Sequence, residues 1–214
     1  MTHDISSAVN GTLIDHAITA AIEPQQYELV RNLGRVLGIQ SEHQVLVLSN
    51  DDALQHALAD EFGCDLTLFD GALQQLPFVD AQFDAVIVAR TVLGALPPFT
   101  RELARVTKQR GTLGMIVLNV HADYVGQADD ALQSLHGAIL RPAAAYRAVL
   151  AESGWTAFVS TPRQGDLLRA TRDTYRQYLL EPAAEAVPRV APQALQLLAT
   201  DGVAVTLITA EQAL

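Results

Sequence analysis

The sequence predicts an α/β protein built on a doubly wound, mostly parallel sheet. Two short runs, "QVLVL" at 44–48 and "FDAVIVAR" at 83–90, are rich in valine and nearly continuous in apolar residues, which is typical of strands buried on both faces. Segments with apolar residues at helical spacing follow these runs. Strands that alternate with helices favour right-handed parallel crossovers, in which helices cover both faces of one sheet.

The remaining elements follow in the order that this fold class requires. An amphipathic helix over 24–38 begins at Pro24 and ends at Gly38, and Asp51 or Asp52 caps the helix that follows the first strand. The patterns then predict strands at 65–70 and 83–90, a helix at 97–109, a strand at 112–120, a helix at 141–154, a strand at 155–161, a helix at 166–181 and a strand at 202–209. We expect one domain over 1–214, with 1–40 as an N-terminal helical segment.

Composition excludes several classes of function. A formal net charge of -10 at pH 7 would repel a phosphate backbone or an anionic membrane, so neither nucleic acid nor a membrane surface is an expected partner. Cys64 is the sole cysteine and the six histidines lack metal-ligand spacing, so we expect neither an internal disulfide nor a metal site. Without a signal peptide or a long apolar run, the chain is predicted to be cytoplasmic.

One segment carries a family resemblance. Residues 73–118, "LQQLPFVDAQFDAVIVARTVLGALPPFTRELARVTKQRGTLGMIVL", resemble the part of class I S-adenosylmethionine-dependent methyltransferases that runs from an acidic turn through a strand and a helix to the next strand. The residues that fall in the family's order and spacing are Leu76, Pro77, Phe78, Asp80, Phe83, Asp84, Glu102, Arg105, Val106 and Gly111. The resemblance implies a Rossmann-like methyltransferase fold.

The turn after the first predicted strand departs from the family. Members follow this strand with a Gly-x-Gly turn, which lets the backbone approach the cofactor. This chain has Ser49, Asn50, Asp51, Asp52 and Ala53 there. Added side chains and like charge beside the cofactor's carboxylate predict the loss of ordinary S-adenosylmethionine binding.

Two further departures concern the adenine side and the substrate side. Between Asp70 and Leu76 there are too few residues for the helix and strand that the family has there, so the sheet is predicted to be shortened by both. Asp70 would then serve as either the ribose acid or the adenine-side acid. At 93–96 the chain lacks the histidine that many small-molecule methyltransferases carry.

Candidate site residues follow from this comparison. The candidate cofactor contacts are Ser49, Asp51, Asp70, Leu73 and Arg90. The candidate catalytic residues are His121 and Tyr124, because "NVHADY" comes just after a strand, where ligands of open α/β sheets bind; a loop histidine without a task is the alternative.

Other charged residues are expected to be structural. Asp51 and Asp52 suit a helix cap better than a cation site. Asp84 is expected to hold its turn together. Arg101, Arg105 and Lys108 fall at helical spacing, which predicts a solvated face of one helix.

Two hypotheses about function remain open. The preferred one is a methyltransferase-like pseudoenzyme that has lost ordinary S-adenosylmethionine binding, has no cofactor, and acts as a non-catalytic partner, scaffold or small-ligand binder, with a protein partner or as a homodimer. The alternative is an active S-adenosylmethionine-dependent methyltransferase of small molecules, or an enzyme of other chemistry in the reshaped pocket.

Overall fold

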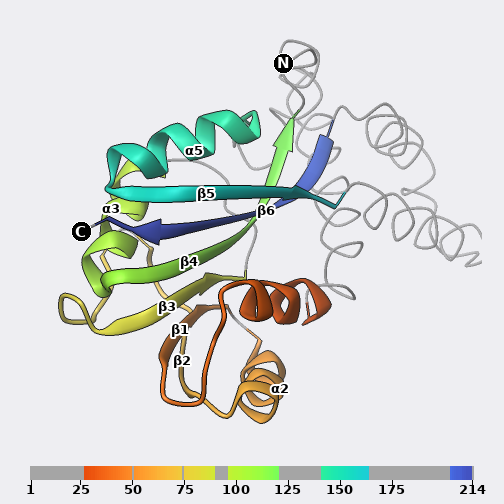
Figure 1. The fold of residues 1–214 in the computed structure, drawn as a ribbon, viewed down its shortest axis with the longest axis vertical. Coiled ribbons are helices and arrows are strands. Elements are labelled where there is room, and N and C mark those ends of the chain that lie inside the picture. The colour runs from red at the N-terminus through yellow and green to blue at the C-terminus, as the bar shows by residue number, and fades with distance from the viewer. Residues whose placement is uncertain are drawn as a thin grey trace, which may run out of the picture. The chain divides into compact units, whose positions relative to one another are not determined.

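The computed structural model describes residues 27–49, 51–73, 75–89, 96–120, 141–163 and 203–213. Residues 27–36 are helical, as the sequence predicts for this part of the 24–38 helix. The elements that follow are β1 (Gln44–Leu48), α2 (Asp52–Phe62), β2 (Asp65–Phe69), β3 (Phe83–Val88), α3 (Leu96–Val106), β4 (Thr107–Val120), α5 (Ala143–Glu152), β5 (Trp155–Pro162) and β6 (Val203–Gln212) (Figure 1). The helix predicted at 166–181 lies outside the described residues.

The strands form one mostly parallel sheet in the order β2-β1-β3-β4-β6-β5. β1 pairs in parallel with β2 on one side and with β3 on the other, and β3 pairs in parallel with β4. β6 runs opposite to β5, since hydrogen bonds join Ala213 N to Gly154 O (2.9 Å) and Arg163 N to Val205 O (2.7 Å). The predicted doubly wound sheet is confirmed.

The side chains of the central strands alternate between the two faces of the sheet. Met115 and Val117 of β4 belong to a buried cluster with residues of α3 and α5. Gly114, the residue before Met115, points the other way, where a Cβ would stand 3.0 Å from Leu37 and 3.2 Å from Leu33. Helices therefore cover both faces, as a doubly wound fold requires.

The predicted shortening of the sheet is also confirmed. Among the strands that the structure describes, β2 is the outermost on this side and lies directly beside β1. Among the described residues from 70 to 82, which lack only residue 74, none is in a helix or a strand. The chain therefore passes from β2 to β3, across β1, by a short irregular connection.

The predicted boundary between the 97–109 helix and the 112–120 strand is wrong. α3 ends at Val106 and β4 begins at the next residue, Thr107, whose Oγ1 donates to Leu103 O at 2.6 Å. The pairing register with β3 slips between Thr107 and Thr112, and Arg110 has φ 61°. This β-bulge explains why the start of β4 was predicted too late. The extra residues of the bulge interrupt the alternation of apolar and polar residues by which a strand is recognised.

The chain divides into two compact units. One comprises Met1–Gln26, Leu118–Pro142 and Pro162–Thr206, most of which lies outside the described residues, and the other comprises Tyr27–Val117, Ala143–Thr161 and Leu207–Leu214. A single domain over 1–214 therefore stays a prediction. Of the helices in the described ranges, none is long and apolar enough to cross a membrane.

Candidate functional site

Ser49 and Asp70 lie side by side at the carboxyl ends of β1 and β2. Leu48 pairs with Phe69 in the parallel register, and Ser49 N donates to Phe69 O at 3.2 Å. Ser49 is fully buried, whereas Asp70 is exposed. The chain leaves β1 for β2 on one side and returns to β3 on the other, so this edge is the topological switch point at which open α/β sheets bind ligands.

The turn from β1 into α2 is held by its own side chains. Asp51 N donates to Ser49 Oγ at 3.1 Å, and Leu54 N donates to Asp51 Oδ1 at 3.4 Å. Asp51 is therefore the N-cap of α2, one of the two caps that the sequence predicts. Among the described non-glycine residues, positive φ occurs at Ala81, Arg110 and Ala157, so neither Ser49 nor Asp51 adopts it.

Of the other candidate residues, the structure describes only Leu73. Leu73 is partly buried and packs against the core cluster. Arg90, His121 and Tyr124 lie outside the described residues. Of the predicted site residues, the structure therefore brings together Ser49, Asp51 and Asp70, which remain candidates for ligand contact.

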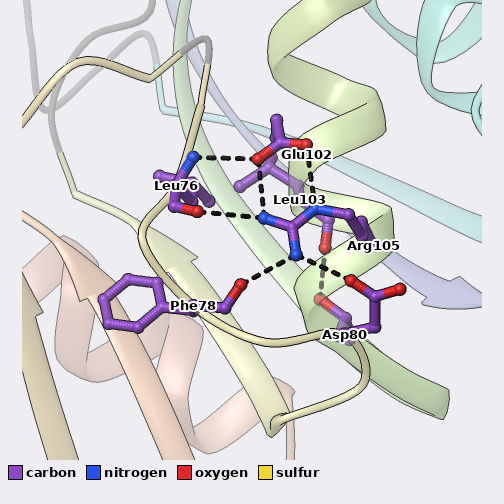
Figure 2. A network of polar contacts seen from close by, with 7 residues as sticks. Leu76, Phe78, Asp80, Glu102, Leu103 and Arg105 are labelled. Atoms are coloured by element: carbon purple, nitrogen blue, oxygen red, sulfur yellow. Dashed lines mark hydrogen bonds and ion pairs between the residues drawn. The ribbon is translucent and has the colours of Figure 1, made fainter.

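The family-like "LPF" segment serves a structural purpose. Arg105 of α3 donates to both oxygens of Glu102, at 2.9 and 2.8 Å, to Phe78 O at 2.8 Å, to Leu76 O at 3.0 Å and to Asp80 Oδ1 at 2.8 Å (Figure 2). Glu102 Oε2 also accepts from Leu76 N at 2.8 Å. The hydrogen bond from Arg105 lowers the pKa of Glu102, and these contacts raise the pKa of Arg105. Arg105 therefore clamps the 76–80 loop to α3.

The predicted solvated face of Arg101, Arg105 and Lys108 is confirmed for Arg101, which is exposed, and is wrong for the other two. Arg105 is the centre of the clamp, and Lys108 belongs to β4. Lys108 Nζ contacts both carboxylate oxygens of Asp84 at 2.9 Å, because the bulge after Thr107 turns the chain there.

Asp84 has the structural role that the sequence analysis expects. Its Oδ2 accepts from Gln44 N at 2.9 Å, which ties the start of β1 to the start of β3. Burial raises the pKa of Asp84, but hydrogen bonds from Lys108 and Gln44 outweigh burial, so the pKa lies below its ordinary value. Because Asp84 stands near the amino end of β3, it lies at the edge of the sheet opposite to Ser49 and Asp70.

One buried polar pair was not predicted from the sequence. Asn119 near the end of β4 is 8% exposed and accepts a hydrogen bond from Thr206 of β6 at 2.7 Å. The signal in the sequence is a single amide after the apolar run "LGMIVL". A lone polar residue at the end of a buried strand could have been singled out, but its partner, 87 residues away, could not.

One family model matches part of the chain. Residues 23–115 match the model of a family described as a methyltransferase domain. The resemblance to the class I methyltransferases is confirmed. The match covers the site edge and the Arg105 clamp, and it ends within β4 of this methyltransferase fold. No curated protein sequence matches the chain significantly.

Solved structures share the methyltransferase fold at low sequence identity. Phosphoethanolamine N-methyltransferase 2 from Haemonchus contortus matches with a TM-score of 0.71 and 13% identity, over 87% of this chain and 53% of its own. Geranyl diphosphate C-methyltransferase from Streptomyces coelicolor matches with a TM-score of 0.63 and 13% identity, over 86% and 74%. The cyclase SpnF matches with a TM-score of 0.53 and 12% identity, over 88% and 81%. At these identities the likeness shows the fold alone.

Proposed function

We propose that this chain binds S-adenosylmethionine at the carboxyl ends of β1 and β2 and transfers its methyl group to a small molecule. The observation that carries the proposal is that Ser49 and Asp70 follow the paired residues Leu48 and Phe69 at the switch point, inside a segment that matches a methyltransferase domain. The comparisons favour this function over the cofactor loss preferred from sequence, since similar structures hold S-adenosylmethionine or S-adenosylhomocysteine.

Asp70 fits the ribose end of the cofactor. Its carboxylate is exposed just past β2, and a carboxylate accepts hydrogen bonds from the two ribose hydroxyls. Next to it, Gly71 leaves room for the Phe69 ring, which a Cβ at this position would overlap. When bound, S-adenosylmethionine supplies an activated methyl group, and the residues of this edge would bind and orient it.

The acidic edge also suits the charge of this cofactor. S-adenosylmethionine carries a sulfonium and an ammonium group against one carboxylate, so it has one more positive charge than S-adenosylhomocysteine. Asp51 and Asp70 would attract the net cation, although Asp51 would repel the cofactor's own carboxylate. Ser49 Oγ is engaged with Asp51 N, so the turn would meet the cofactor through Asp51 and not through glycine backbone.

The acceptor is proposed to be a small molecule. The similar structures named as methyltransferases have geranyl diphosphate and phosphoethanolamine in their names, both small. The net charge of -10 disfavours nucleic acid.

Calorimetric titration with S-adenosylmethionine and S-adenosylhomocysteine tests the proposal. The expected dissociation constants are about 1–100 μM. Asp70→Ala should weaken both about tenfold, which corresponds to about 1.4 kcal/mol, and Asp60→Ala, an exposed acid of α2, is the matched control. If neither compound binds the unmodified chain at millimolar concentration, the proposal is wrong.

A second candidate is a non-catalytic partner or scaffold, as a homodimer or with another protein. It is favoured by the buried Ser49 and the capping Asp51, which give the turn a structural use. Under this candidate the chain binds neither compound, whereas a variant with a glycine-rich turn at 49–53 does. The mass of the native particle would show whether it forms a dimer. A cytoplasmic location stays a prediction.

A further inference from the structure

Three phenylalanine rings connect the site edge to the core. Phe69 ends β2, and its ring meets the ring of Phe78 edge-to-face, with centroids 5.5 Å apart and planes at 73°. Phe78 meets Phe83 in the same way, at 5.1 Å and 89°. Phe83 is 1% exposed, whereas the other two rings are partly buried and pack against the core cluster. The rings therefore form a row from the core to the residue before Asp70.

The Phe69 ring lies against the backbone just past Asp70. A Cβ on Gly71 would overlap Cζ of Phe69 and stand 2.8 Å from its Cε1 and Cε2. On the other side of Asp70, Phe69 O accepts a hydrogen bond from Ser49 N at 3.2 Å. The backbone of Asp70 is therefore bounded on both sides, by this hydrogen bond before it and by the ring after it.

Phe78 restricts the movement of the Phe69 ring. A ring at the end of a side chain moves by rotation about its χ angles, and a second ring packed against it removes part of that freedom. Phe78 can do this because it is itself fixed. Its carbonyl oxygen accepts from Arg105 at 2.8 Å, and its ring packs on the buried ring of Phe83. Loss of the Phe78 ring would therefore free the ring that lies against Gly71.

We propose that Phe78 is a positioning residue for the cofactor, because its ring keeps Phe69 against Gly71 and so sets where the Asp70 carboxylate meets the ribose hydroxyls. This inference rests on the proposed function and extends it from Asp70 to a residue that acts through Phe69. An acceptor already held in place loses little freedom on binding, so more of its hydrogen-bond energy contributes to affinity. All of these residues belong to the same compact unit.

The preference for a ribose that carries hydroxyl groups tests the inference. Adenosine and 2′,3′-dideoxyadenosine differ only in the two ribose hydroxyls, and each is titrated into the full chain in competition with S-adenosylhomocysteine. The unmodified chain should bind adenosine at least about tenfold more tightly, because Asp70 accepts hydrogen bonds from these hydroxyls. Phe78→Leu keeps the carbonyl that Arg105 holds but removes the ring, so it should reduce this preference at least about threefold. Phe78→Tyr keeps the ring and should retain the preference.

Phe158→Leu is the matched control for a general loss of packing. Phe158 is also a partly buried phenylalanine that packs against the core cluster, but it lies on β5. The control should leave the preference for adenosine unchanged, even where urea denaturation shows a loss of stability similar to that of Phe78→Leu. An equal preference in Phe78→Leu and Phe78→Tyr, or an equal decrease in Phe78→Leu and Phe158→Leu, overturns the inference.

A second pair of variants covers the case in which Phe78→Leu does not fold. Gly71→Ala should displace the Phe69 ring and weaken the binding of S-adenosylhomocysteine several-fold. In a Phe69→Leu background, whose smaller side chain leaves room for the added Cβ, Gly71→Ala should weaken binding much less. If the two substitutions weaken binding additively, the ring does not act through Gly71 and the inference is overturned.

The same titrations separate this inference from the proposed function. Failure of the unmodified chain to bind S-adenosylhomocysteine would contradict the proposed function. If that compound binds but the unmodified chain does not distinguish the two nucleosides, Asp70 does not bind the ribose hydroxyls and the inference is overturned. Normal binding with a preference for adenosine that Phe78→Leu leaves unchanged would contradict this inference alone.

Discussion

Arg105 donates from Nε and a terminal nitrogen to the two carboxylate oxygens of Glu102, and the same guanidinium holds the carbonyl oxygens of Leu76 and Phe78. The two nitrogens of a planar guanidinium can donate to both oxygens of a carboxylate in the same plane. A lysine ammonium cannot make this two-point contact. The loop that precedes β3 is therefore tied to α3 by the side chain of Arg105 together with that of Glu102, which accepts from Leu76 N. The "LPF" segment and the Glu-x-x-Arg spacing of α3 are parts of one contact.

We expect Arg105→Lys to lower the free energy of unfolding by about 1–3 kcal/mol, because the loop carbonyls lose their donors and Glu102 loses its two-point partner. Urea denaturation followed by circular dichroism measures the change. Arg101→Lys, on the exposed side of the same helix, should stay within about 0.5 kcal/mol of the unmodified chain. Equal effects of the two changes would contradict the clamp.

The free energy of unfolding should decrease at acidic pH because Asp84 and Glu102 become protonated. Folding lowers the pKa of both groups below their ordinary values of 3.8 and 4.5, so at acidic pH the folded chain binds fewer protons than the unfolded chain. Their contribution is complete above the ordinary values and is lost as the pH falls through the lowered ones. Asp84→Asn should therefore reduce the loss of unfolding free energy between about pH 6 and about pH 3. Asp60→Asn serves as the control, and an unchanged pH slope in Asp84→Asn would refute this role.

Gly111→Ala should destabilise the bulge of β4. A Cβ at this position would stand 2.8 Å from Lys108 O and 2.9 Å from Asp84 O, and backbone atoms cannot move away cheaply. We expect a loss of about 1–3 kcal/mol in thermal or urea unfolding. Gly38→Ala is the comparison, since Gly38 has φ 64° with open space around it and should lose only about 1 kcal/mol from backbone strain. If Gly111→Ala lowers the free energy of unfolding by less than Gly38→Ala does, the backbone of the bulge moves to accommodate the added Cβ and the prediction is wrong.

The negative charge of Asp51 and Asp70 should affect how tightly the chain binds S-adenosylmethionine relative to S-adenosylhomocysteine. If Asp51 and Asp70 attract the extra positive charge of S-adenosylmethionine, this compound should bind more tightly than S-adenosylhomocysteine at low salt, and added salt should narrow the difference. Asp70→Asn should reduce the ratio of the two dissociation constants severalfold. A ratio that does not respond to the substitution or to salt would show that these carboxylates do not face the sulfonium.

The strands of the sheet and the cap at the start of α2 could be predicted from the sequence. Features that depend on contacts between residues far apart in the chain could not. Valine-rich runs locate β1 and β3 because burial on both faces leaves a continuous apolar pattern, and the short connection after Asp70 leaves no room for another strand. Asp51 could be identified as a cap because capping is local. The end of α3 and the partner of Asn119 could not be predicted, because a bulge and a contact 87 residues away leave no local pattern.

Amide hydrogen exchange with and without S-adenosylmethionine reports both whether the chain binds the cofactor and where it binds. We expect slower exchange in the bound state at the end of β1 and start of α2, around Ser49 to Leu54, and at the end of β2, around Phe69 to Leu73. The opposite edge of the sheet, at Gln44 and Asp84, should be unchanged. Protection confined to other segments, or none at saturating S-adenosylmethionine, would contradict the claim that this edge is the cofactor site.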